Sequence, residues 1–89
     1  MFTTKKLERI VKGFSNHRRI QIMDLLEKNP ELSVSEIAAA VKTNMKTASE
    51  HIRRLTLSGL IMKRHQAQNV RHKLTSRGSL ILKFLRTLE

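Results

Sequence analysis

The 89-residue sequence contains no cysteine, tryptophan or tyrosine. The missing thiols exclude disulfides, thiolate metal sites and a cysteine nucleophile. Phenylalanine is the only aromatic residue and occurs three times, which argues against single-strand binding, because that mode needs exposed aromatic platforms for base stacking. The three glycines are scattered, and no acid pair, nucleophile–base set or glycine-rich phosphate loop is visible. The sequence therefore does not indicate an enzyme.

Long apolar runs are also missing, since no stretch approaches the ~18 residues of a membrane-spanning helix. The N-terminal segment is amphipathic and lacks the apolar centre of a signal peptide, so we expect a cytoplasmic protein. A hydrophobic content of 39% suits a folded chain, and the length suits one small domain over residues 1–89. The core of so small a domain is marginal, which favours self-association.

Acidic residues are few, and the basic excess is unevenly distributed. Eighteen Lys and Arg oppose seven Asp and Glu, which gives a formal net charge of +11 and a pI near 11.3. Residues 1–41 carry seven basic and five acidic side chains, whereas residues 42–89 carry eleven basic and two acidic ones. A solvated basic surface is the simpler explanation, but this unevenness favours a polyanionic partner for the second half of the chain.

Hydrophobic periodicity and capping residues predict three helices in the first half of the chain. The first covers residues 4–15. The second runs from His17 to Lys28 and stops before Pro30, because a residue that precedes proline is pushed out of the helical region. A capping box that begins at Ser33 opens a short third helix.

The second half predicts one more helix, a hairpin and a last helix. After a turn at residues 42–44, the fourth helix covers Met45–Ser58 and ends at Gly59 in a left-handed conformation. The hairpin pairs residues 60–65 with 70–74, and the last helix begins after residue 75 or 76. The fold class is therefore mainly α with a small β-hairpin, in the order of a winged helix-turn-helix.

The helix over residues 45–58 is the candidate recognition helix for double-stranded DNA. Ala48, Ile52 and Leu55 share one face at spacings of four and three, so they would hold the helix against the body. The opposite face would enter the major groove, which admits a helix and carries an unambiguous base code. The predicted base contacts are Lys46, Thr47, Ser49, Glu50 and Arg53.

Simpler roles are open to the charged members of this set. Arg53 could be an ordinary surface charge, whereas on DNA it would bind guanine O6 and N7, as would Lys46. Glu50 could accept from a cytosine amino group, or it could pair with Lys46 or Arg54 four residues away. We favour DNA contact for Lys46, Ser49 and Arg53, and both roles stay open for Glu50.

Phosphate contacts are predicted mainly from the hairpin, whose second strand alternates apolar and basic residues from Val70 to Leu74. Such contacts position a protein without reading base sequence. The predicted set is Ser33, Asn44, His51, Lys63, Arg64, Arg71 and Lys73. His51 could equally be an imidazole that only packs. The other histidines show no metal-ligand spacing, so we expect no metal ion and no cofactor.

The last helix carries an apolar stripe that is wide for so small a domain. The stripe could pack on the chain's own core, but a second subunit that contacts the first and last helices is the favoured explanation. The predicted dimer interface is Leu7, Ile10, Val11, Leu80, Ile81, Phe84, Leu85 and Leu88. Two subunits would place their recognition helices ~34 Å apart on a palindromic site.

Two segments carry a family resemblance. GFSNHRRIQIMDLL, which begins at Gly13, is similar to Ala-Leu-(x)-(Asp/Asn)-Pro-Thr-Arg-(x)-x-Ile-Leu-x-Leu-Leu, with His17 in place of the proline. TASEHIRRLTLSGLI, which begins at Thr47, is similar to Thr-Val-Ser-x-His-Leu-x-x-Leu-x-x-x-Gly-Leu-Val. Over residues 13–75 the chain thus resembles the ArsR-type winged-helix repressors. The resemblance implies a homodimeric, sequence-specific regulator of transcription, usually a repressor, that binds double-stranded DNA.

The chain departs from that family at its metal box and hairpin tip. Metal-sensing members carry Glu-Leu-Cys-Val-Cys-Asp-Leu where residues 31–37 read ELSVSEI, and hydroxyls are poor ligands for soft metals. Ala67 stands where the family often has glycine, and we expect Asn69 to supply the left-handed residue instead. The competing hypothesis is a winged-helix module that binds protein or structured RNA within a larger complex.

Overall fold

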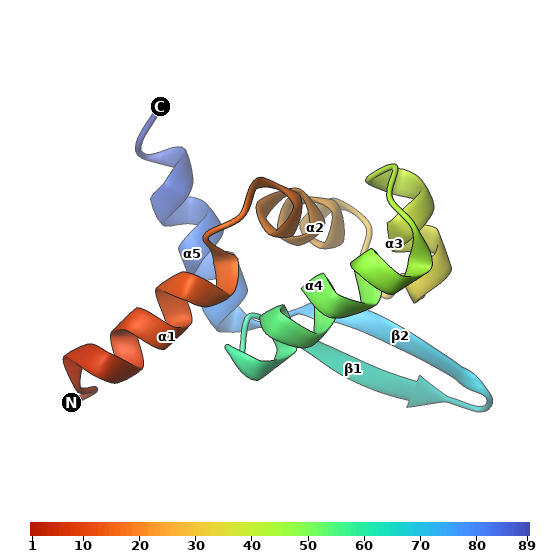
Figure 1. The fold of residues 1–89 in the computed structure, drawn as a ribbon, viewed down its shortest axis with the longest axis horizontal. Coiled ribbons are helices and arrows are strands. Elements are labelled where there is room, and N and C mark those ends of the chain that lie inside the picture. Colours follow the sequence, from red (N-terminus) through yellow and green to blue (C-terminus); the bar gives the residue numbers. More distant parts are fainter.

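The computed structural model describes residues 1–89 and contains five helices and one two-stranded antiparallel sheet (Figure 1). In chain order these are α1 (Thr4–Phe14), α2 (His17–Lys28), α3 (Val34–Ala40), α4 (Met45–Leu57), β1 (Ile61–Gln66), β2 (Asn69–Leu74) and α5 (Ser76–Arg86). A short turn joins α3 to α4, and the hairpin extends as a wing (Figure 1). The predicted winged helix-turn-helix is confirmed. None of the helices is long and apolar enough to cross a membrane.

Polar side chains fix the first turn of every helix. Thr3, Asn16, Ser33, Asn44 and Thr75 precede α1 to α5 in that order, and each side chain accepts a hydrogen bond from a backbone amide two or three residues further on. The capping box at the start of α3 is complete in both directions. These local signals explain why the predicted helix ends lie within one residue of the observed ones for α1, α2 and α4.

The hydrophobic core lies where α2, α3, α4 and the base of the wing meet. Each large apolar side chain that is fully enclosed there stabilises the fold by about 1.5–3 kcal/mol. The fully buried side chains are Ile22, Met23, Leu26, Ile37, Ile52, Leu55, Leu60, Ile61 and His72. The core therefore holds the inner face of α4, and the outer face stays available.

The tip of the wing differs from the prediction. The strands pair from Ile61 opposite Leu74 to Gln66 opposite Asn69, so only two residues form the loop. Ala67 takes the left-handed conformation with φ 55°, whereas Asn69 lies in the strand. The expectation that Asn69 supplies the left-handed residue is therefore wrong. The longer strand pairing requires a turn at Ala67, despite the strain that a Cβ meets there.

The segment before α3 closes the free edge of β2. The backbone amide of His72 donates to the Leu32 carbonyl, and the Glu31 amide donates to the His72 carbonyl, both at 2.9 Å. The His72 ring is 1% exposed, and its Nδ1 lies 2.9 Å from the Leu32 carbonyl oxygen. Burial lowers the pKa of His72, so the ring is neutral near pH 7. This bridge fixes the wing to the start of the helix-turn-helix.

Candidate nucleic-acid interface

The outer face of α4 is polar and open to solvent. Lys46, Ser49, Glu50 and Arg53 are all exposed, and Thr47 is half-buried. The opposite face is held by three buried side chains, Ala48, Ile52 and Leu55. The orientation expected of a recognition helix is therefore present, and this face can meet a groove without disturbing the core.

Glu50 is bound by two arginines of its own helix. Arg53 donates to both carboxylate oxygens of Glu50, at 3.0 and 2.8 Å, and Arg54 donates to one of them at 3.2 Å. The hydrogen bond from Arg53, followed by that from Arg54, lowers the pKa of Glu50 to about 2. The intrahelical pairing considered for Glu50 is thus present. Its partners are Arg54, as considered, and Arg53, whereas Lys46 does not take part. Lys46 has no carboxylate partner.

His51 connects α4 to α2 and to the end of α1. The Arg19 Nε donates to its Nδ1 at 3.1 Å, and the same guanidinium donates to the Lys12 carbonyl at 3.2 Å. Burial and then the charge of Arg19 lower the pKa of His51, which favours the neutral ring. Because Nδ1 accepts, the proton of the neutral ring lies on Nε2. The half-buried ring therefore packs and still presents an N–H donor.

Two predicted phosphate-contacting residues also act as helix caps. The Asn44 Oδ1 accepts from the Thr47 amide at 2.7 Å, and the Ser33 Oγ accepts from the Glu36 amide at 3.2 Å. The side-chain amide group of Asn44 remains as a donor at a helix N-terminus, where anions are favoured, and the Ser33 Oγ also lies 3.1 Å from the Ser35 Oγ, so one of these two hydroxyls donates to the other. Both positions are compatible with a phosphate contact in addition to capping.

The four basic side chains predicted from the wing do not share one face. Residues opposite each other in an antiparallel pair point to the same side of the sheet. Lys63 pairs with His72 and therefore lies on the side that packs on the body. Arg64 pairs with Arg71, and Lys73 lies on the same side as these two arginines. A backbone approaching one face of the wing would meet three of the four cations.

Two wing arginines are held by carboxylates near the start of α3. Arg64 forms an ion pair with Glu31, and Arg71 donates to Glu36 at 2.7 Å. Hydrogen bonds from Ser33, and then the charge of Arg71, lower the pKa of Glu36. Lysines, by contrast, remain without carboxylate partners on the wing. The cations that have no such partner in the chain are Lys5, Lys6, Arg9, Arg18, Arg19, Lys42, Lys46, Lys63, Lys73, Arg77 and Lys83.

Sequence reasoning missed two cations next to the candidate interface. Arg54 is exposed beside Arg53 and shares Glu50 with it. Lys42 is exposed in the turn before α4 and takes a left-handed conformation with φ 57°. The spacing of four from Glu50 pointed to Arg54 as a partner, but not to its place on the flank of the helix. No group of three or more His, Asp or Glu side chains is arranged to hold a metal ion.

The fold and the exposed α4 face define a winged helix-turn-helix protein, and comparison with known families agrees. The model described as bacterial regulatory protein, arsR family, matches residues 16–63. This match covers more than half of the chain, which therefore belongs to the arsR family of bacterial regulatory proteins.

Individual relatives are named as regulators of transcription. The transcriptional activator HlyU of Vibrio cholerae is 36% identical over 67 residues, which are 75% of this chain and 61% of that protein. The HTH-type transcriptional regulator Rv0324 of Mycobacterium tuberculosis is 38% identical over 61 residues, which are 68% of this chain and 26% of that protein. The chain thus spans less than two thirds of the length of these curated relatives.

A solved relative shares nearly the whole fold. The homodimeric winged helix-turn-helix DNA-binding domain of Mb0332 from Mycobacterium bovis, a possible ArsR-family transcriptional regulator, superposes with a TM-score of 0.86. Its sequence is 27% identical, and the match covers 96% of this chain and 79% of that one.

Proposed function

We propose that the chain binds a specific double-stranded DNA site as a homodimer and regulates transcription, with α4 in the major groove and the wing on the phosphate backbone. The observation that carries this proposal is the outer face of α4, which is polar and exposed while its inner face is anchored in the core. Family membership supports a regulatory role. The family resemblance favours repression, and the relative HlyU, named an activator, makes activation the alternative.

Base reading in this proposal comes from the outer face of α4. Lys46 and Ser49 are unpaired and can contact base edges directly. Arg53 must leave Glu50, and Arg54 can keep that carboxylate neutralised when it does. Each good bidentate contact is worth about 1–3 kcal/mol of discrimination between bases. The proposed reading set stays Lys46, Thr47, Ser49, Glu50 and Arg53.

Backbone contacts in this proposal surround α4. Lys63 and Lys73 are exposed and unpaired, and Arg64 and Arg71 are oriented by their carboxylates. The Nε2–H of His51 adds a neutral donor beside α4. The full proposed set is Ser33, Asn44, His51, Lys63, Arg64, Arg71 and Lys73.

The homodimer rests on the terminal helices, which lie together at the end of the molecule opposite the wing (Figure 1). Leu7 and Val11 of α1 are about half exposed, and Leu80 and Phe84 of α5 and Leu88 after it are more exposed still. Leu7 and Val11, and likewise Leu80 and Phe84, are four positions apart, so each helix carries an exposed apolar stripe. The other three predicted interface residues, Ile10, Ile81 and Leu85, are half-buried against the chain's own core. The relative Mb0332 domain is homodimeric.

Selection of bound duplexes from a random pool tests the proposal. We expect enrichment of one palindromic duplex. Structured RNA of equal length should compete poorly with this duplex for the protein. A pool that yields no enriched duplex, or equal competition by the RNA, would contradict sequence-specific DNA binding and favour the interaction module.

A further inference from the structure

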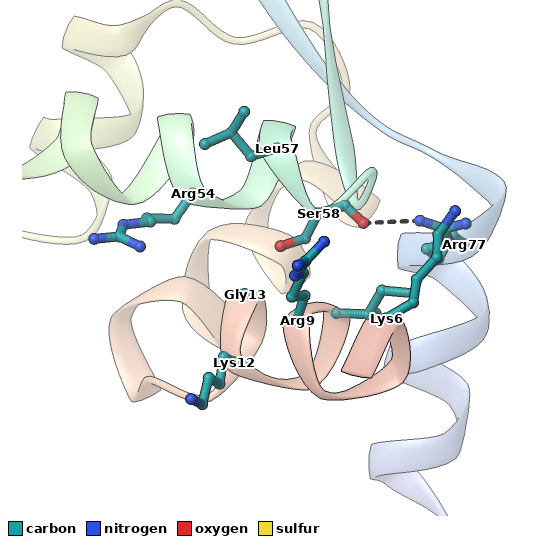
Figure 2. Close-up of a pocket in the computed structure, with 9 residues that line it drawn as sticks. Lys6, Arg9, Lys12, Gly13, Arg54, Leu57, Ser58 and Arg77 are labelled. Atoms are coloured by element: carbon teal, nitrogen blue, oxygen red, sulfur yellow. Dashed lines mark hydrogen bonds between the residues drawn. The ribbon is translucent and has the colours of Figure 1, made fainter. Parts of the chain in front are cut away.

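A concave site lies between α1, the end of α4 and the start of α5, away from the proposed base-reading face (Figure 2). The pocket has a volume of about 500 Å³, which is within the range of small-molecule sites. Its lining includes no acidic side chain and five basic ones, Lys6, Arg9, Lys12, Arg54 and Arg77. Such a concentration of one charge in a cavity attracts anions.

The sequence brings these cations together through one close helix crossing. Lys6, Arg9 and Lys12 recur every three residues and therefore lie along one flank of α1. Gly13 lies against Ser58 at the end of α4, where a Cβ on Gly13 would come within 1.8 Å of the Ser58 Oγ. Only a residue without a Cβ permits this close approach of α1 to α4. Both helices therefore contribute walls to the pocket.

Three of the five basic side chains in the pocket have no carboxylate partner, whereas Arg54 binds Glu50 and Lys12 lies near Glu8. Arg77 donates to the Ser58 carbonyl at 3.0 Å, which orients its guanidinium without neutralising it (Figure 2). Lys6 lies 4.3 Å from the centre of the Phe2 ring, and Arg9 has no acidic partner. Lys12 reaches Glu8 only at 3.8 Å between exposed side chains. Exposed pairs of this length contribute little.

We infer that this pocket binds a small molecule that carries two or more phosphate groups. Guanidinium groups bind phosphate oxygens in a bidentate manner, and lysines add mobile charges. The five basic side chains come from α1, α4 and α5, and a single phosphate offers too few oxygens to bind all of them. A duplex backbone is convex, and the half-buried Arg77 is less accessible to it than the exposed lysines of the wing.

Calorimetric titration of the protein with sodium tripolyphosphate, without DNA and at physiological salt, tests this inference. We expect saturable binding with one site per chain. Arg9→Gln and Lys6→Gln should each weaken binding at least tenfold. The matched control is Lys5→Gln, which removes the same charge from the next residue of α1 outside the pocket and should change affinity less than twofold. Thermal unfolding of each variant verifies that it is folded.

Three results would overturn the inference. One is the absence of saturable binding by the folded wild-type protein. Another is equal weakening by Lys5→Gln and Lys6→Gln, which would indicate general charge attraction. The third is a loss of duplex affinity in Arg9→Gln without any tripolyphosphate binding, which would assign the pocket to the DNA backbone. Because the tripolyphosphate titration contains no DNA and duplex affinity is measured separately, a failure of this inference can be told apart from a failure of the proposed DNA-binding function.

Discussion

At the scale of single residues, the proposed DNA binding by α4 has to account for Glu50, which lies between Arg53 and Arg54. The carboxylate holds both guanidinium groups in fixed positions while the protein is free. On DNA it would lie near phosphates and base edges, where its negative charge is unfavourable unless an arginine stays with it. We therefore expect Glu50 to limit indiscriminate DNA binding, because only a site that offers better acceptors would release the arginines.

Glu50→Gln should strengthen binding to random duplex and make it more salt-dependent. Each additional phosphate that the protein neutralises adds ~0.9 to the slope of log affinity against log salt, so we expect a slope steeper by about one. Fluorescence anisotropy over a salt series measures this slope. Glu27→Gln on α2 removes the same charge from a residue without an ion pair. Equal slopes for the two variants would show that Glu50 has no such role.

Ala67→Gly should stabilise the protein by about 0.5–1 kcal/mol. Ala67 has φ 55°, and a non-glycine residue in that region costs about 1–2 kcal/mol. Glycine removes this strain but loses more conformational entropy on folding than alanine does, so the net gain is smaller than the strain. Urea denaturation measures the free energy of unfolding. Gln68→Gly, at the other loop position, should bring no gain, because Gln68 does not have a positive φ. An unchanged or lower stability for Ala67→Gly would contradict the strain.

At the scale of elements, the wing depends on one buried imidazole. The ring of His72 is enclosed in the core, and its backbone forms the bridge to Leu32. Burial lowers the pKa of His72 below its ordinary value of 6.5, and burial with Arg19 does the same for His51. The folded state therefore requires both rings to be neutral. Protonation would bury a charge at His72 and would remove the Nδ1 acceptor by which His51 binds Arg19.

The free energy of unfolding should fall as the pH drops below about 6.5. In that pH range the unfolded chain binds protons that the folded chain does not, so the free energy of unfolding decreases as the pH falls. The decrease ends below the pKa values that the two histidines have in the folded state. Urea denaturation between pH 8 and pH 5 measures the slope. His72→Gln should be less stable at pH 8 and show a shallower slope, because it removes one of the two buried rings that resist protonation. A flat profile in the wild type would refute this linkage.

Much of the element layout could be predicted from the sequence, because its signals are local. Caps such as Asn16 and Asn44 mark helix starts, Pro30 lies beyond the end of α2, and the spacing of Ile52 and Leu55 identifies the inner face of α4. The tip of the wing was wrongly predicted, since the strand pairing and not residue preference selects the turn.

Partner choices among charged side chains were less predictable. Arg71 and Glu36 are 35 residues apart, and their ion pair depends on how β2 is placed beside α3. Arg9 and Arg77 line one pocket only because Gly13 lets α1 cross the end of α4. Such features depend on tertiary packing, which hydrophobic periodicity does not specify. For the same reason the individual DNA contacts stay predictions.

At the scale of the whole molecule, the terminal helices carry exposed apolar side chains as well as basic ones. The stripe on α1 and α5 exposes large apolar side chains that water disfavours, and a second copy of the chain would cover them. A two-fold dimer formed there would present two α4 helices on the same side, which matches a palindromic site.

Phe84→Asp should convert the dimer to a monomer without unfolding it. Phe84 is 57% exposed, so the free chain can accept a charge there, whereas an apolar dimer interface cannot. Sedimentation equilibrium gives the mass. Met62→Asp, at an exposed apolar residue of the wing, should leave the dimer intact. A wild-type protein that is monomeric at micromolar concentration, or a dimeric Phe84→Asp variant, would contradict the proposed interface.

The most direct test of the central claim is the ratio of affinities for the selected duplex and for random duplex of equal length. For a specific regulator we expect the wild type to prefer its selected site by about 10³-fold or more. Arg53→Ala should reduce that ratio about tenfold or more, and Lys83→Ala on α5 should leave it unchanged, although both remove one positive charge. A ratio near one for the wild type, or the same ratio in Arg53→Ala, would contradict the claim that the outer face of α4 reads DNA sequence.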